Sequence, residues 1–203
     1  MKVLSEETCL ADPIEQFRHW FIEAEKCKDI ILPEAMCLST VDEEGHPDAR
    51  MMLLKEFREE KFIFYTNTNS SKGQSLRAHP FVALTFYWSP LKRQVRIKGP
   101  VNVVSDQEAD EYFSTRPRLS QVGAWASDQS AIIEDRATLE KAFEKFRKKF
   151  EGQDVSRPPH WSGFALIPLR IEFWQERDNR LHDRIVYQRK TLTTEWEAFR
   201  LNP

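Results

Sequence analysis

The fold is limited most by a run of short segments with strand character that follow one another closely along the chain. The segments are Ala35–Val41, Arg50–Lys55, Lys61–Asn67, Phe81–Trp88, Arg93–Lys98 and Pro100–Val104. Turn-forming residues in the cluster Asp42–Pro47 separate the first two. Several strands at such short spacing are typical of an antiparallel barrel rather than of a parallel sheet.

Helical segments flank these strands. Asp12-Pro13-Ile14-Glu15 combines an N-cap, a proline at the first helical position and an early carboxylate, and predicts a helix that runs to about Lys28. Further helices are predicted after Asn69, from Ser105 and over residues 135–150, and further strands over residues 163–175, 181–189 and 195–201. We therefore expect a flexible N-terminal arm over residues 1–11 and one α+β domain over residues 12–203, an antiparallel β-barrel with flanking helices.

Glycine is scarce and scattered, which excludes whole classes of phosphate site. The six glycines are never closer than eleven positions, so neither G-x-G-x-x-G nor the P-loop spacing can be written. A bound phosphate would have to be held by side chains or helix N-termini.

The remaining composition is that of an ordinary folded protein. The 30 basic and 32 acidic residues nearly cancel, which argues against a dedicated duplex DNA binder. Three sparse cysteines, Cys9, Cys27 and Cys37, lack zinc spacing and are typical of reduced thiols. The apolar run Phe81–Trp88 is too short for a membrane span. We expect a cytoplasmic protein without a metal, a nucleic acid partner or a membrane partner.

The first candidate for chemistry is Arg180-Leu181-His182-Asp183-Arg184. In a strand, positions 180, 182 and 184 project from one face, so two guanidiniums and an imidazole would line up. Such a row beside Phe173-Trp174 suits an anionic, planar ligand, because arginine both pairs with phosphate and stacks. A solvated strand face explains the periodicity equally well.

Three further segments carry cations or hydroxyls. In Arg50–Lys55, two cations bracket four apolar residues, which suits either a binding strand or a strand with exposed ends. Tyr112, Arg116 and Ser120 stand near a helix end that Pro117 terminates, where they could meet one phosphate or simply lie on a helix surface. Ser70-Ser71-Lys72 stands at a helix start, where the helix dipole favours an anion.

Nothing in the sequence indicates a protein nucleophile. No cysteine has a recognisable histidine partner, and G-x-S-x-G does not occur. Several anion sites without a nucleophile fit cofactor chemistry, in which the protein orients the reactants and the cofactor reacts.

Together these segments resemble the pyridoxine/pyridoxamine 5′-phosphate oxidase family. The stretch Ile171–Arg184 resembles the C-terminal signature of that family with every fixed position filled. Other blocks match in the same order, over about residue 12 to the C-terminus: Arg50–Lys55, Phe64–Asn67, Arg93–Val95, Tyr112–Pro117, Ser120-Gln121 and Gln129-Ser130.

The resemblance implies an FMN-binding split β-barrel and a homodimer with FMN at the subunit interface. The implied reaction is oxidation of pyridoxamine or pyridoxine 5′-phosphate to pyridoxal 5′-phosphate, with hydride passing from C4′ to flavin N5 and O2 reduced to H2O2. Arg180 and His182 would orient the substrate ring as catalytic residues. The implied substrate-binding residues are Lys55, Tyr112, Arg116, Ser120, Arg180 and His182. The implied FMN-binding residues are Arg50, Met51, Met52, Leu53, Leu54, Lys55, Tyr65, Thr66, Ser71, Lys72, Gln94, Gln129, Ser130, Trp174 and Arg184.

One position departs from the family pattern. Where the family commonly has Ser-Arg-Lys, this chain has Ser70-Ser71-Lys72, which predicts weaker FMN retention. Two alternatives remain open: a related flavin oxidase of the phenazine type, and a non-catalytic protein that binds FMN or pyridoxal phosphate.

Overall fold

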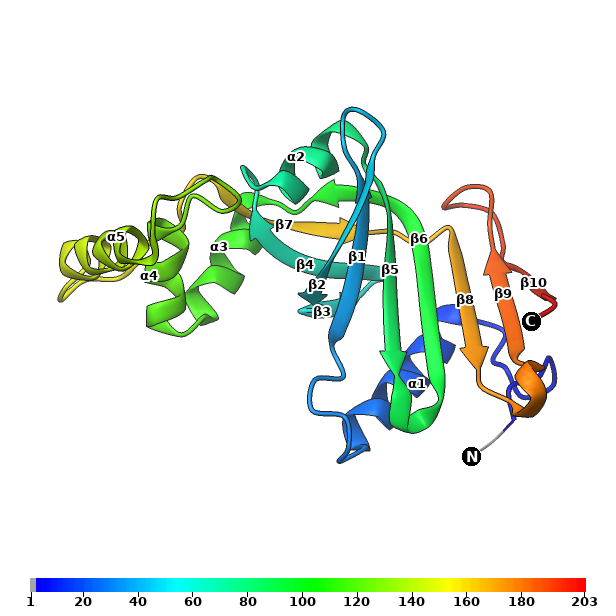
Figure 1. Ribbon diagram of the computed structural model, residues 1–203. Coiled ribbons are helices and arrows are strands. Elements are labelled where there is room, and N and C mark those ends of the chain that lie inside the picture. Colours follow the sequence, from blue (N-terminus) through cyan, green and yellow to red (C-terminus); the bar gives the residue numbers. More distant parts are fainter. Residues whose placement is uncertain (1–2) are drawn as a thin grey trace.

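A curled antiparallel sheet organises the chain in the computed structural model, which describes residues 3–203 (Figure 1). The principal strand order is β10-β9-β8-β6-β5-β1-β2. A second branch leaves β6 in the order β7-β4-β3. The helices are α1 (Pro13–Lys26), α2 (Ser71–Ala78), α3 (Asp106–Thr115), α4 (Arg118–Ala126) and α5 (Arg136–Lys149). The strands are β1 (Ala35–Val41), β2 (Pro47–Leu53), β3 (Glu56–Arg58), β4 (Lys61–Asn67), β5 (Phe81–Trp88), β6 (Arg93–Val103), β7 (Trp161–Leu166), β8 (Arg170–Gln175), β9 (Asp183–Gln188) and β10 (Glu197–Arg200).

The sheet divides along β6, which pairs with β8 over residues 93–98 and with β7 over residues 101–103. At the division, a Cβ added to Gly99 would stand 2.0 Å from the carbonyl oxygen of Ile167. Only glycine permits the chain between β7 and β8 to cross there. The split barrel predicted from the family resemblance is therefore the observed fold.

Helix α1 closes one end of the barrel. It begins as predicted, because Asp12 Oδ1 accepts a hydrogen bond of 2.8 Å from the backbone N–H of Ile14. Phe17 of this helix is fully buried, and its ring centroid lies 4.9 Å from that of Phe62 and 5.3 Å from that of Phe86. These edge and tilted contacts join the helix to both branches of the sheet.

Helices α3, α4 and α5 gather at the far end of β4 and β7, on the left in Figure 1. They enclose a separate apolar cluster of Phe113, Val122, Phe150, Val155 and Trp161. Helix α4 was not predicted from the sequence. Pro117 does end α3, but it also stands at the N-cap position of the next helix, where a proline removes no intrahelical hydrogen bond.

Three strand predictions were wrong. The segments Arg93–Lys98 and Pro100–Val104, predicted as two strands, form most of one continuous strand, β6. Residues 163–175 form two strands rather than one, because Pro168 has no N–H to donate and interrupts the ladder where the chain passes Gly99 of β6. Strand β9 begins at Asp183, so the predicted row of residues 180, 182 and 184 on one strand face does not exist. Asn179 and Arg180 instead adopt left-handed backbone angles, with φ of 57° and 61°, which a strand cannot accommodate.

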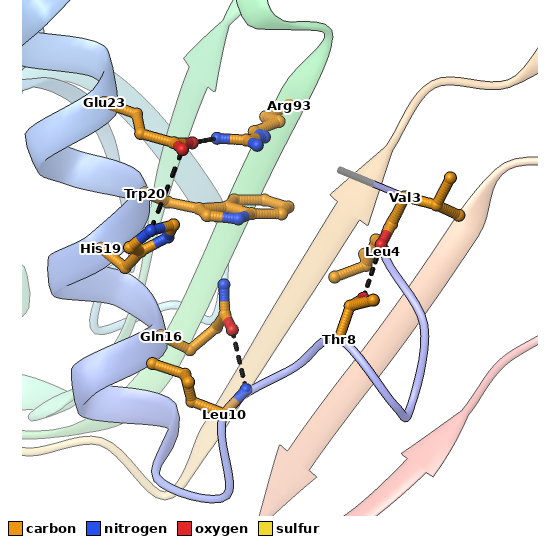
Figure 2. Close-up of a pocket in the computed structure, with 9 residues that line it drawn as sticks. All are labelled: Val3, Leu4, Thr8, Leu10, Gln16, His19, Trp20, Glu23 and Arg93. Atoms are coloured by element: carbon orange, nitrogen blue, oxygen red, sulfur yellow. Dashed lines mark hydrogen bonds and ion pairs between the residues drawn. The ribbon is translucent and has the colours of Figure 1, made fainter. Parts of the chain in front are cut away.

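The segment before α1 lies against the barrel (Figure 2). Leu4 is buried, and its N–H donates a 2.8 Å hydrogen bond to Gln175 Oε1. The Leu10 N–H donates to Gln16 Oε1 at 3.0 Å, and the Leu10 carbonyl accepts from the Tyr187 hydroxyl at 2.6 Å. Residues 1 and 2 of the expected flexible arm lie outside the described residues, and the mobility of the arm stays a prediction.

A cavity of about 120 Å³ lies between this segment and α1 (Figure 2). Arg93 of β6 lies over the ring of Trp20, 4.4 Å from its centroid, and pairs with Glu23. Within residues 3–203, no helix is both long and apolar enough to cross a bilayer.

Candidate functional site

A pocket of about 390 Å³ opens where β4 meets the start of α2 and the ends of α3 and α4. Its walls combine polar, cationic and aromatic side chains. The residues that line it are Met52, Tyr65, Thr66, Asn67, Lys72, Arg116, Ser120, Gly123, Ala124, Ser127, Gln129 and Trp161. Seven of them were predicted site residues: Met52, Tyr65, Thr66, Lys72, Arg116, Ser120 and Gln129.

The polar side of the pocket joins segments far apart in the sequence. Lys72 Nζ donates to Gln129 Oε1 at 3.0 Å, and the Thr66 hydroxyl donates to the same oxygen at 3.4 Å. The side chain of Asn67 donates to the carbonyl of Ser127 at 3.3 Å. One amide oxygen therefore holds together the end of β4, the start of α2 and the loop after α4.

The start of α2 is built for close approach. The Ser70 hydroxyl caps the helix by accepting from the Gly73 N–H at 3.3 Å. A Cβ on Gly73 would stand 2.4 Å from the carbonyl oxygen of Thr68, so glycine is required at this turn. The helix N-terminus consequently lies beside the pocket, with Lys72 in its first turn.

Two neighbouring cations, Lys72 and Arg50, favour the binding of an anion at this place. Burial lowers the pKa of Lys72, and the nearby charge of Arg50 lowers it further. Arg50 is held by a 2.8 Å hydrogen bond to the Thr40 hydroxyl and a 2.6 Å ion pair with Asp48. A bound phosphate would relieve the unfavourable interaction between the two cations.

Three parallel aromatic rings form the wall nearest α3. The Tyr65 centroid lies 4.0 Å from that of Tyr112 and 5.2 Å from that of Trp161. Burial raises the pKa of Tyr65, and the carboxylate of Glu56, which accepts from the Tyr65 hydroxyl at 3.1 Å, raises it further. Gly163 leaves room for the Tyr65 ring, because a Cβ there would lie 2.6 Å from it.

Arg116 brings an unsatisfied cation to the same pocket. Its guanidinium lies 4.8 Å from the centroid of Trp161 and 5.4 Å from that of Phe113. Its Nη1 atom is buried and has no hydrogen-bond partner among residues 3–203. Burial lowers the pKa of Arg116. Because Ser120 lines the same pocket, an anion here would find both a charge and a hydroxyl.

A second group of predicted residues lies elsewhere on the sheet. Gln94, Trp174 and Arg184 stand directly opposite one another on β6, β8 and β9, and therefore share one face. The rings of Trp174 and His182 lie 4.7 Å apart. Arg184 is held by Glu172, whose Oε1 accepts at 2.8 Å from Nη2 and at 3.0 Å from Nε.

The two groups are not brought together within one chain. In Figure 1, α3 and α4 lie at the left, while β8 and β9 lie at the right beyond β5 and β6. Arg180 is exposed in the turn η2 (Asp178–Arg180) that precedes β9. The pocket and the group around His182 are therefore two separate surfaces of one chain.

Some predicted residues lie outside the pocket lining. Leu54 is part of the barrel core, and Lys55, which was expected within a strand, follows the end of β2 and is exposed. Arg50 lies half-buried on β2, and Tyr112 stacks on the lining residues Tyr65 and Trp161. The others are Met51, Leu53, Ser71 and Ser130, of which only Leu53 is not exposed.

Sequence reasoning missed several lining residues, above all Trp161, Asn67 and Ser127. Trp161 stacks on Tyr65 because β4 and β7 pair in the register Tyr65 with Gly163. No periodicity or spacing around Trp161 predicts that register.

Outside the pocket, Asp42, Glu44 and His46 bring potential metal-ligand atoms within 4.8 Å of one another in the exposed turn between β1 and β2. A hydrogen bond of 2.7 Å from the His46 N–H to Asp42 Oδ1 holds that turn.

Comparison with known proteins gives a consistent family. Residues 24–150 match the family described as pyridoxamine 5′-phosphate oxidase, and residues 161–203 match the C-terminal dimerisation region of pyridoxine 5′-phosphate oxidase. The chain belongs to the pyridoxine/pyridoxamine 5′-phosphate oxidase family. The C-terminal match covers β7–β10 together with the turn between β8 and β9, and so includes Trp174, His182 and Arg184.

Individual relatives of the oxidase family cover nearly the whole chain. The pyridoxine/pyridoxamine 5′-phosphate oxidase of Azorhizobium caulinodans is 50% identical over 97% of this chain and 92% of its own length. The pyridoxine-5′-phosphate oxidase of Bos taurus is 48% identical over 93% of this chain and 73% of its own. Among solved structures, PhzG from Burkholderia lata, in complex with tetrahydrophenazine-1-carboxylic acid, has a TM-score of 0.89 at 26% identity over 100% of this chain and 99% of its own.

Proposed function

We propose that this chain oxidises pyridoxine and pyridoxamine 5′-phosphate to pyridoxal 5′-phosphate with bound FMN and O2, as a homodimer. The proposal rests on one observation above all. The pocket contains Arg116, whose buried Nη1 atom has no hydrogen-bond partner among the described residues, together with Ser120 and a wall of parallel aromatic rings. A phosphorylated aromatic ring fits this pocket, because its phosphate would pair with Arg116 and its flat ring would pack against the aromatic wall.

The residues around Lys72 fit the phosphate of FMN. Lys72 and Arg50 are cations that disfavour each other, and the capped N-terminus of α2 adds backbone N–H groups and a favourable dipole. In this proposal Arg50 and Lys72 hold the phosphate, with Ser71 exposed beside them. Thr66 and Gln129 complete that end of the site through their contact with one another.

The surface around Trp174 and His182 can belong to the same active site only if it comes from a second copy of the chain. Gln94, Trp174 and Arg184 of one protomer then meet the pocket of its partner, and Arg180 and His182 lie against the substrate ring. The match of residues 161–203 to a dimerisation region supports this arrangement. A two-fold axis would produce two identical sites.

FMN held by Arg50 and Lys72 would supply the redox chemistry, namely acceptance of a hydride from the substrate and reoxidation by O2 to give H2O2. The side chains of the protein have the other tasks. Arg116, Ser120 and Tyr112 fix the substrate phosphate, and Lys55, exposed at the end of β2, is proposed to close over it. Fixing that phosphate turns the reaction into one of orientation within the site. No side chain needs to act as a nucleophile.

The deciding experiment is anaerobic. Pyridoxamine 5′-phosphate is added to FMN-loaded protein, and the flavin absorbance is followed. We expect bleaching, and release of pyridoxal 5′-phosphate after air is admitted. Failure to bleach with FMN fully bound would reject the oxidase function. Bleaching without release of pyridoxal 5′-phosphate would favour a carrier that retains it.

The likeness to PhzG makes a phenazine-type substrate the second candidate. The same anaerobic assay with tetrahydrophenazine-1-carboxylic acid separates the two. We expect no bleaching with that compound, because a single carboxylate would leave much of the phosphate clamp around Arg116 without its anion.

A further inference from the structure

The turn between β8 and β9 holds its residues in an unfavourable backbone conformation. Asn179 and Arg180 have φ of 57° and 61°, a left-handed region that residues other than glycine seldom adopt. Within the turn, the only backbone hydrogen bond between described residues is that from the Leu181 N–H to the Asp178 carbonyl, 3.1 Å long. Such a conformation persists only where surrounding contacts enforce it.

The two ends of the turn are tied together by Arg177 and Asp183. Arg177 Nε donates to Asp183 Oδ2 at 2.6 Å, which closes the turn across its base. The backbone N–H of the same arginine donates to Nδ1 of His182 at 3.1 Å. Arg177 therefore fixes the turn with its side chain and the imidazole with its backbone.

The second oxygen of Asp183 extends the connection to the C-terminal strand and the N-terminal segment. Arg200 Nη1 donates to Asp183 Oδ1 at 2.8 Å. The other two nitrogens of Arg200 donate to the two carboxylate oxygens of Glu6, each at 2.9 Å. Four alternating charges thus run from the segment before α1 to the base of the turn.

The links in this chain differ in strength. The side chain of Asp183 is 15% exposed and lies between two guanidiniums. The side chains of Glu6 and Arg200 are 59% and 39% exposed, so solvent weakens their pair. Asp183 is therefore the central residue, and the N-terminal segment supports it from outside.

The hydrogen bond to His182 also determines where its proton lies. Because Nδ1 accepts from the Arg177 N–H, a neutral His182 carries its proton on Nε2. The ring then presents an Nε2–H donor, at an orientation further limited by Trp174, 4.7 Å away.

We propose that Asp183 is a positioning residue, which clasps the turn through Arg177 and so holds Arg180 and His182 in place, with His182 in the Nε2–H form. The roles of Arg180 and His182 rest on the proposed function, but the clasp and the tautomer do not. This separation allows one experiment to test the two independently.

The test compares Asp183→Asn with Asp110→Asn in the FMN-loaded dimer. Asp110 also pairs with an arginine, Arg157 Nε at 2.6 Å, and lies outside both groups of site residues. For Asp183→Asn we expect kcat to fall about tenfold, the size expected for losing a charge-assisted hydrogen bond. KM, FMN affinity and the melting temperature should stay close to those of Asp110→Asn.

Nitrogen-15 NMR shows which ring nitrogen of His182 carries the proton. A purely structural role of Asp183 would not change that tautomer. Wild type and Asp110→Asn should show the Nε2–H form, and Asp183→Asn a mixture of tautomers. A wild-type His182 with its proton on Nδ1, or an Asp183→Asn variant with unchanged kcat and spectrum, would overturn the proposal. If Asp183→Asn does not fold, Arg177→Gln must produce the same spectral change. If the wild type oxidises no B6 phosphate yet shows the expected spectra, the clasp stands and the proposed function falls.

Discussion

The ring of Tyr65 lies flat against that of Tyr112, with 4.0 Å between centroids and 9° between planes. Trp161 lies parallel to Tyr65 at 5.2 Å and 7°. The space for this stack depends on Gly163, which stands opposite Tyr65 in the pairing of β4 with β7. The aromatic wall of the pocket is therefore set by a residue without a side chain.

Gly163→Ala should disturb that wall directly. The new Cβ would lie 2.6 Å from the Tyr65 ring and 2.9 Å from Val104 Cγ2, so the ring must move. Overpacking of this kind costs about 1–3 kcal/mol. Urea denaturation should show a loss of that size, and pyridoxal 5′-phosphate binding should weaken. Gly123→Ala is the control. Gly123 lies within helix α4, and a Cβ there would have a single neighbour within 4 Å, the Phe143 ring at 4.0 Å. This variant should keep the stability of the wild type or exceed it. Equal stabilities for the two variants would contradict the steric argument.

The parts of this fold that could be predicted from the sequence are those determined by residues close together in the chain. The bounds of β1, β4 and β5 were predicted as observed, and so was the Asp12 cap, because alternation and capping are local in sequence. Helix α4 was missed because a proline both ends one helix and begins the next. The left-handed turn at Arg180 was missed because distant contacts enforce it, among them that of Arg200 with Asp183.

The same division holds for the site. The contact of Lys72 with Gln129 joins residues 57 positions apart, which no spacing rule predicts. The family resemblance predicted only that both residues belong to one site. Trp161 had neither a motif nor a periodicity, and its position follows from strand register alone.

Ser71→Arg should tighten FMN binding. Ser71 is the exposed first residue of α2, beside Lys72 and next to the helix N-terminus. An arginine there adds a charged hydrogen bond, worth about 1.5–3 kcal/mol, or roughly a ten- to hundredfold lower Kd. Quenching of flavin fluorescence measures both dissociation constants. Equal values for wild type and variant would refute the prediction.

FMN affinity should fall as the pH rises. Burial, and then the charge of Arg50, lowers the pKa of Lys72 in the free protein, whereas a bound phosphate favours the charged amine. Above that lowered pKa, binding requires uptake of a proton, so Kd should rise by up to about tenfold per pH unit. The phosphate adds no slope above neutrality, since its second pKa is near 6. Titrations that extend from neutrality to the ordinary lysine pKa of 10.5 should show the slope in wild type and not in Lys72→Met. The same slope in both would contradict the assignment.

His182→Ala should separate turnover from cofactor binding. An imidazole that orients the substrate ring affects the reaction rather than the flavin, and misplacement of a reacting group costs about a hundredfold in rate. We expect kcat to fall by that order while the Kd for FMN changes less than about twofold. A variant that loses FMN but turns over normally when saturated would place His182 against the flavin instead.

Mixed dimers should recover activity if each site is shared between two copies. Arg116→Ala and His182→Ala damage two separate surfaces of one chain. Arg116 caps the end of α3 and His182 directly precedes β9, and Figure 1 shows α3 and β9 on opposite sides of the fold. In a mixed dimer, one of the two sites would combine an intact Arg116 from one protomer with an intact His182 from the other. Random reassortment makes half of the dimers mixed, so activity should return to about a quarter of that of wild type. Mixing Arg116→Ala with Ser120→Ala, which damage the same pocket, should restore nothing. Recovery in neither mixture would mean that Arg116 and His182 act within a single chain, against the separation seen in the fold.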